Sequence, residues 1–175
     1  MPRPRVVWLT GLSGAGKSTL AEGLAAKLRV QGERVAILDG DALRRGLCSD
    51  LGFTAADRVE NIRRTAEVAR LMLDQGLWVV VALISPFRRD RSLARARFAQ
   101  GDFVEVYVDA PLALVETRDP KGLYARARRG ELREFTGIDS PYEPPESPEL
   151  RIETGRCTVP EAISALLVAL DTSAR

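Results

Sequence analysis

A glycine-rich segment close to the start of the chain limits the possible folds more than any other feature. It matches the phosphate-binding pattern GxxxxGK[ST] at every required position. An apolar run, residues 6–9, precedes it, and leucines at helical spacing follow it. A strand, a glycine loop and a helix in this order surround a polyphosphate with backbone N–H groups and a helix N-terminus. We therefore predict an α/β nucleotide-binding fold whose phosphate-binding loop (P-loop) consists of Gly11, Leu12, Ser13, Gly14, Ala15, Gly16, Lys17, Ser18 and Thr19.

Two side chains of the P-loop have expected chemical roles. Lys17 would reach the terminal phosphates of ATP, and the Ser18 hydroxyl would ligate Mg²⁺. Of the 26 basic residues only Lys17, Lys27 and Lys121 are lysine. A chain that otherwise uses arginine but keeps lysine at position 17 indicates that a compact ammonium is needed there. The same reasoning draws attention to Lys121.

Apolar strands alternate with helical patterns along the rest of the chain. Residues 35–38 and 79–84 are continuously apolar, as in strands buried on both faces of a parallel sheet. The alternation predicts one domain, residues 1–175, built as a three-layer α/β sandwich with ligands at the C-terminal ends of its strands. We expect strands at residues 6–10, 34–38, 78–84, 103–108 and 150–153, and helices at residues 17–30, 41–47, 57–75, 88–99, 112–117 and 160–170.

The composition narrows the chemistry and the cellular setting. The chain has no histidine, so carboxylates, Arg, Lys and Mg²⁺ are left for catalysis. Cys48 and Cys157 have no metal-ligand spacing and are expected to be free thiols in a reducing compartment. A net charge of +2 gives no reason to expect a nucleic-acid partner, and no stretch reads as a membrane span or a secretory signal. We expect a cytoplasmic protein.

One segment, residues 118–149, departs from the alternating pattern. It is rich in Arg, Gly and Pro and also contains aromatic residues. Loops of this length inside compact domains are usually functional lids or disordered linkers. The mixture of aromatic, glycine and basic residues favours a mobile lid over a linker, and we call this segment the lid.

Polar side chains follow two of the predicted strands. Asp41 lies at the start of a predicted helix, where it is either a helix N-cap or a carboxylate that holds a Mg²⁺-bound water or accepts a proton. Ser85 follows the strand at residues 78–84, where it is either a functional hydroxyl or a helix lead-in before Pro86. That strand ends without an acidic residue, which favours a small-molecule kinase over a motor-type NTPase.

A loop near residue 53 carries groups suited to a nucleotide acceptor. Phe53 follows Gly52 where no core stripe requires an aromatic ring, and rings in loops can stack on a base. Arg44 and Arg58 lie on either side of it in sequence and suit bidentate contacts to an anion.

Several longer blocks resemble one family of P-loop enzymes, adenylylsulfate kinase (APS kinase). The motifs occur in that family's order over nearly the whole chain. Beyond the P-loop the resemblance is carried by Leu38–Asp41, residues 50–53, residues 57–64, residues 84–88, residues 118–124 and the Phe-Thr-Gly-Ile-Asp block at 135–139.

The resemblance implies an activity and its partners. It implies transfer of the ATP γ-phosphate to the 3′-hydroxyl of adenosine 5′-phosphosulfate, with Mg²⁺ as cofactor. It also implies a homodimer, and association with or fusion to ATP sulfurylase.

The resemblance further implies roles for named residues. Phe53 and Phe135 would clamp the acceptor's adenine, and Asp41 would be a Mg²⁺-associated carboxylate or base. Family descriptions assign a phosphoserine intermediate to the Ser85 position, although direct transfer fits P-loop chemistry better. Arg118 and Cys157 would surround the adenine of ATP. The remaining acceptor-site residues implied are Arg44, Arg58, Asn61, Ile84, Lys121, Gly122 and Leu123.

Two other functions share part of this pattern. Another small P-loop kinase, acting on gluconate, shikimate or an antibiotic, would not need both Phe53 and the 135–139 block. A non-catalytic nucleotide sensor could lose Lys17, Ser18 or Asp41, and all three are present.

Overall fold

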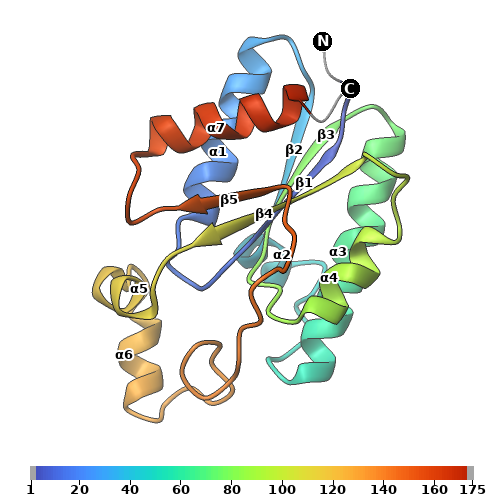
Figure 1. Cartoon of the computed structure of the whole chain (residues 1–175). Helices are drawn as coiled ribbons and strands as arrows, with labels where there is room; N and C mark the ends of the chain where they lie inside the picture. Colours follow the sequence, from blue (N-terminus) through green and yellow to red (C-terminus); the bar gives the residue numbers. More distant parts are fainter. Residues whose placement is uncertain (1–2, 173–175) are drawn as a thin grey trace.

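The computed structural model describes residues 3–172, in which strands and helices alternate (Figure 1). The strands are β1 (Val6–Thr10), β2 (Val35–Asp39), β3 (Trp78–Ala82), β4 (Phe103–Asp109) and β5 (Leu150–Glu153). The helices are α1 (Lys17–Val30), α2 (Gly40–Arg45), α3 (Ala55–Asp74), α4 (Arg88–Arg95), α5 (Leu112–Arg118), α6 (Leu123–Arg128) and α7 (Val159–Thr172).

The five strands form one parallel sheet in the order β2-β3-β1-β4-β5. The central strand, β1, pairs on both sides, so that Val7 lies opposite Val80 on β3 and Val104 on β4. The P-loop therefore leaves the middle of the sheet at its C-terminal edge, where open α/β sheets bind ligands.

Helices cover both faces of the sheet, which confirms the predicted three-layer sandwich. Figure 1 shows α1 and α7 on one face, and α3 with α4 on the other. Alternate residues of β1 serve the two layers: Val7 and Leu9 belong to the core cluster under α1 and α7, whereas Val6 and Trp8 belong to the cluster under α3 and α4. No helix within residues 3–172 is both long and apolar enough to cross a membrane.

Two predictions about local structure were wrong. Residues 123–128 of the lid form the short helix α6, where no helix was predicted. The strand expected to reach residue 84 ends at Ala82, and Ser85 lies beyond it with a left-handed φ of 41°. Of the two alternatives left open for Asp41, the structure excludes the N-cap, because Asp39 takes that position in α2 and its carboxylate accepts the Asp41 N–H at 2.9 Å. Elsewhere the predicted helix and strand ends match the observed ones or differ from them by at most four residues, the largest difference being that α4 ends at Arg95.

Candidate active site

A cavity of about 940 Å³ lies at the C-terminal ends of the strands. Its wall has five parts: the P-loop with the start of α1, the region from the end of β2 to α3, residues 82–86 after β3, the lid, and the region from the end of β5 to the start of α7. This volume is at the upper end of the range typical of small-molecule sites. The cavity is therefore large enough for a nucleotide together with a second ligand.

Backbone shape in the P-loop depends on glycine. Gly11 has a φ of 152°, and a Cβ atom there would lie 2.3 Å from the carbonyl oxygen of Val108 on β4. Gly14 and Gly16 also have positive φ values, 75° and 107°. Gly16 immediately precedes α1, so the loop delivers the N-terminus of this helix to the cavity.

Lys17 is buried and is held by the loop that it follows. Its Nζ donates hydrogen bonds to the carbonyl oxygens of Gly11 at 3.0 Å and Leu12 at 2.7 Å. Burial, and then the positive charge of Lys121, lowers the pKa of Lys17 to about 7, against the opposing effect of Asp39 and Asp41. An arriving polyphosphate would reverse this effect, because an anion stabilises the charged form of the amine.

The Ser18 hydroxyl lies beside a carboxylate at the end of β2. It donates a 2.6 Å hydrogen bond to Asp39 Oδ2. Sequence reasoning assigned this neighbourhood to Asp41 and missed Asp39 as a site residue. The available signal was its place directly after the apolar run 35–38, at the C-terminal end of a parallel strand, where functional side chains gather.

Asp41 pairs instead with the lid. Lys121 Nζ donates to Asp41 Oδ2, and both side chains are about half exposed. The structure thus brings together two predicted site residues that are 80 positions apart in sequence.

The predicted acceptor arginines hold the loop that carries Phe53. The Arg44 guanidinium lies 4.2 Å from the centroid of the Phe53 ring and donates to the Gly52 carbonyl at 2.8 Å. Arg58 is buried and donates to the Phe53 carbonyl at 3.0 Å and to the Glu134 carbonyl, in the lid, at 2.6 Å. Phe53 itself is 57% exposed, so its ring is not a core residue.

Phe135 reaches the same cavity from the lid. Its ring packs edge-on against Tyr124 of α6 at 5.0 Å, and Tyr124 donates a hydrogen bond to the Ser13 carbonyl of the P-loop at 2.8 Å. The next residue, Thr136, also lines the cavity, and its buried hydroxyl has no hydrogen-bond partner within residues 3–172. Sequence reasoning did not single out Thr136.

Ser85 is buried with its hydroxyl engaged. The indole N–H of Trp8 donates to Ser85 Oγ at 3.1 Å, and the Ser85 hydroxyl donates to the Leu83 carbonyl at 3.4 Å. Ile84 lies beside it on the cavity wall.

The other end of the cavity is closed by contacts to the P-loop backbone. Arg118 donates to the carbonyl oxygens of Gly14 at 3.4 Å and Thr154 at 3.0 Å. Thr154, which sequence reasoning missed, donates from its hydroxyl to the Ala15 carbonyl at 2.9 Å. Cys157 lines the same end and its thiol donates to the Glu153 carbonyl at 3.4 Å.

Most of the predicted site residues line this one cavity. Three predicted residues do not line it: Gly11, Leu12 and Gly122. The carbonyl groups of Gly11 and Leu12 accept hydrogen bonds from Lys17, and Gly122 is the N-cap of α6. Within residues 3–172 there is no cluster of three acidic, histidine or cysteine side chains suited to a metal ion. The predicted residues that do line the cavity are Ser13, Gly14, Ala15, Gly16, Lys17, Ser18, Thr19, Asp41, Arg44, Phe53, Arg58, Asn61, Ile84, Ser85, Arg118, Lys121, Leu123, Phe135 and Cys157.

Comparisons with known proteins agree with this geometry. The family model for adenylylsulphate kinase matches residues 3–153. The chain is 59% identical to an adenylyl-sulfate kinase of Burkholderia ambifaria, over 95% of this chain and 93% of that protein. It is 58% identical to the bifunctional enzyme CysN/CysC of Xylella fastidiosa over 95% of its own length, which spans only 27% of that larger protein.

Solved structures give the same result. The structure of the Mycobacterium tuberculosis APS kinase CysC in complex with AMPPNP and APS matches with a TM-score of 0.93 and 48% identity, covering 98% of this chain and 99% of that one. The fold, the cavity and these similarities lead to one conclusion: the chain belongs to the adenylylsulphate kinase family.

Proposed function

We propose that the chain transfers the γ-phosphate of ATP to the 3′-hydroxyl of adenosine 5′-phosphosulfate, giving 3′-phosphoadenosine 5′-phosphosulfate and ADP. The observation that carries the proposal is the single cavity shared by the P-loop and the two aromatic residues Phe53 and Phe135. Membership in the adenylylsulphate kinase family supports the same reaction.

ATP is assigned to the end of the cavity formed by the P-loop. The backbone N–H groups of residues 13–18 and the N-terminus of α1 would hold its phosphates, with Lys17 on the terminal ones. Arg118 and Cys157 line this end, and we place the adenine of ATP beside them.

Adenosine 5′-phosphosulfate is assigned to the end between α2, α3 and the lid. Arg44, Arg58 and Asn61 line that end, and its charge suits a doubly anionic ligand. Phe53 and Phe135 would stack on the two faces of its adenine. The acceptor would then lie with its ribose toward Asp41 and Lys121.

Mg²⁺ fits the donor set beside Ser18. A hydroxyl and the Asp39 carboxylate lie 2.6 Å apart there, and oxygen atoms are the ligands that Mg²⁺ prefers. Because protein donors are few, phosphate oxygens and water would supply the remaining ligands. When bound, the ion neutralises charge on the phosphates; Ser18 and Asp39 would hold it, with Asp41 nearby.

Transfer is proposed to be direct. Phosphoryl transfer depends mainly on positioning and charge neutralisation, for which Lys17 and Lys121 are suitably placed. Asp41 would accept the proton of the acceptor hydroxyl once its ion pair with Lys121 is released.

The test is a coupled ADP-release assay with a panel of acceptors. Adenosine 5′-phosphosulfate should support turnover, whereas gluconate and shikimate should not. Lys17→Ala should lower kcat/KM by on the order of 10³-fold or more, because it removes a charged contact to the transferred group. The matched control is Lys27→Ala, which replaces an exposed lysine of the same helix and should leave kcat/KM unchanged. Turnover in Lys17→Ala that equals the control would refute the assignment.

We also propose a cellular compartment, a partner enzyme and an oligomeric state for this protein. The two cysteines are both free thiols, which suits the reducing cytoplasm. One relative carries the matching region inside a larger bifunctional enzyme, which supports association with or fusion to a second enzyme, and we propose that this partner is an ATP sulfurylase. We also propose a homodimer as the catalytic unit. Size-exclusion chromatography with light scattering tests the dimer.

A further inference from the structure

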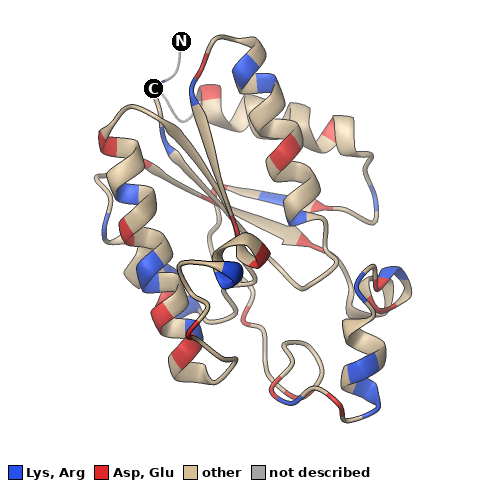
Figure 2. Ribbon diagram, turned by 180° about the vertical axis from the view of Figure 1, so that it is seen from behind, with Lys and Arg blue, Asp and Glu red and all other residues tan. Residues whose placement is uncertain are grey.

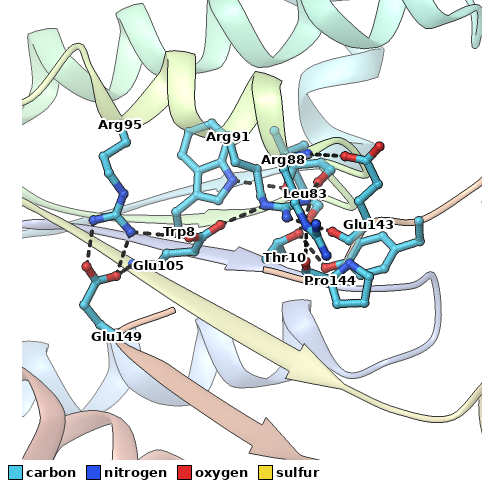
Figure 3. Close-up of polar contacts among 12 residues, drawn as sticks. Trp8, Thr10, Leu83, Arg88, Arg91, Arg95, Glu105, Glu143, Pro144 and Glu149 are labelled. Atoms are coloured by element: carbon cyan, nitrogen blue, oxygen red, sulfur yellow. Dashed lines mark hydrogen bonds and ion pairs between the residues drawn. The ribbon is translucent and has the colours of Figure 1, made fainter. Parts of the chain in front are cut away.

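Three arginines on α4 bind the last part of the lid, residues 143–149 (Figure 3). The Arg88 backbone N–H donates to the Glu143 carboxylate at 2.8 Å, and the Arg88 side chain donates to the Pro144 carbonyl at 2.7 Å. Arg95, two turns later, pairs with Glu149 at 2.6 Å. The lid is therefore fastened to α4 where it returns to the sheet.

The middle arginine, Arg91, differs from the other two in burial and in what it joins. Its side chain is only 3% exposed. Its three donor nitrogens go to three separate segments: Nε to the Glu105 carboxylate of β4 at 2.8 Å, Nη1 to the Ser85 carbonyl at 2.7 Å, and Nη2 to the Glu143 carbonyl at 2.7 Å.

Two of those segments form or flank the proposed acceptor end of the cavity. Ser85 has a φ of 41°, a conformation that costs a residue with a side chain and must be held by its surroundings. Its neighbours Ile84 and Pro86 line the cavity. The Glu143 N–H donates to the Pro86 carbonyl at 2.8 Å, and Tyr142 shares a 2.9 Å hydrogen bond with Thr10.

We propose that Arg91 is a positioning residue for the acceptor. Among the described residues it is not one that lines the cavity, so it would not touch either substrate. By holding the carbonyl groups of Ser85 and Glu143 at fixed distances from each other, it sets the cavity wall at Ile84–Pro86 relative to the lid. Phe135 lies eight residues before Glu143, so the position of this ring also depends on that attachment. The proposal rests on the proposed function.

Arginine is required for this role because of its shape. The planar guanidinium presents several donors in a rigid fork, whereas a lysine ammonium is a single charged point on a flexible chain. Lysine at position 91 would keep a positive charge for Glu105 but would not span both carbonyl groups. Within residues 3–172, the hydrogen bonds of Arg91 go to Glu105, Ser85 and Glu143 and not to the P-loop, which is linked to this segment only through the 3.4 Å hydrogen bond from the Gly11 N–H to the Ile84 carbonyl. Binding of ATP should therefore change much less than binding of the acceptor.

The test compares Arg91→Lys with Arg95→Lys, and both with the unmodified enzyme. Arg95 lies on the same helix and also contacts Glu105, at 3.3 Å, but makes no contact with Ser85 or Glu143. Arg91→Lys should raise the KM for adenosine 5′-phosphosulfate by on the order of tenfold or more, with the KM for ATP changed less than about twofold. Arg95→Lys should leave both KM values within about twofold.

A second variant is used should Arg91→Lys fail to fold. Arg91→Met combined with Glu105→Met removes both charges of the buried pair, a replacement that cores often tolerate. It should show the same selective rise in acceptor KM. Equal rises for both substrates, or an unchanged acceptor KM in either folded variant, would overturn the positioning role. Absence of turnover in the unmodified enzyme would instead refute the proposed function.

Discussion

At the scale of single residues, Lys17 is the group whose charge should change when a ligand binds. Its pKa is lowered to about 7, first by burial and then by Lys121. Bound phosphates would raise that pKa again, so above pH 7 nucleotide binding should take up a proton.

Proton uptake gives a pH prediction with a definite sign. Nucleotide affinity should fall as the pH rises above 7, by up to about tenfold per pH unit. Calorimetric titration at pH 8 in two buffers of different ionisation heat should report uptake of about one proton per nucleotide. Lys17→Met is the control and should take up none. Identical proton uptake in the two proteins would contradict the assignment of this pKa to Lys17.

The same pKa affects folding. The free energy of unfolding should rise with pH from about 7 to the ordinary lysine value of 10.5, because over that range the unfolded chain binds one more proton at Lys17 than the folded protein. The difference between the unmodified protein and Lys17→Met, measured by urea denaturation across that range, isolates this contribution.

Ser85 gives a second prediction at this scale. Its hydroxyl bonds to Trp8 and to the Leu83 carbonyl, and the chain contains no histidine to activate it. Ser85→Ala should therefore keep kcat within about tenfold of the unmodified enzyme, while the unpaired Trp8 N–H costs about 1–3 kcal/mol of stability. Turnover is measured beside chemical denaturation. Loss of activity in a well-folded variant, or a phosphoserine formed at the rate of turnover, would favour the covalent route.

At the scale of the elements, the sequence was most informative where one segment fixes its own structure. The observed bounds of β1, α1 and β5 match the predicted ones. For β1 and α1 the reason is that the apolar strand and the glycine loop leave little choice. The short helix α6 was missed because side-chain contacts decide it, among them the hydrogen bond from the Tyr124 hydroxyl to the Ser13 carbonyl 111 positions away. The Asp119 carboxylate accepts the N–H groups of Tyr124 and Ala125, and the Tyr124 ring packs against Phe135.

The residues of the candidate site also fall into two groups, those that a local motif predicts and those that only long-range contacts place there. The P-loop and Phe53 could be read from the sequence, since each has a local signature. Thr154 donates a hydrogen bond to the P-loop backbone across 139 positions, and Thr136 of the lid is buried and lines the cavity. Periodicity and local motifs carry no information about such contacts.

The two aromatic residues of the proposed clamp belong to different elements and should respond differently. Phe53→Ala and Phe135→Ala should each weaken binding of adenosine 5′-phosphosulfate about 10–100-fold, since each removes one stacking contact, while ATP binding changes little. Phe53 is exposed, so its loss should not lower the melting temperature; Phe135 packs against the core and its loss should. Calorimetric titration with each ligand, beside thermal melts, tests this. Equal losses for both ligands would contradict the clamp.

At the scale of the whole molecule, the lid is held at both ends and less in its middle. Arg118 and Tyr124 attach its start to the P-loop, and α4 binds its end. The tip, residues 128–133, is largely exposed and projects from the body of the protein (Figure 1). Figure 2 shows basic residues gathered on α6 beside it. Local stability should therefore be lowest at the tip.

This unequal attachment predicts where a protease first cuts the chain and that bound ligands slow the cut. Trypsin should cleave first between residues 126 and 133, because exposed arginines there lie in the segment that opens most readily. A non-hydrolysable ATP analogue together with adenosine 5′-phosphosulfate should slow that cut about tenfold for each 1.4 kcal/mol by which the ligands favour the closed lid. Mass spectrometry of timed digests identifies the site and its rate. Phe135→Ala is the control, since a lid that lacks this ring should be protected less by the same ligands. A first cut outside the lid, or an equal rate with and without ligands, would show that the lid does not close over the substrates.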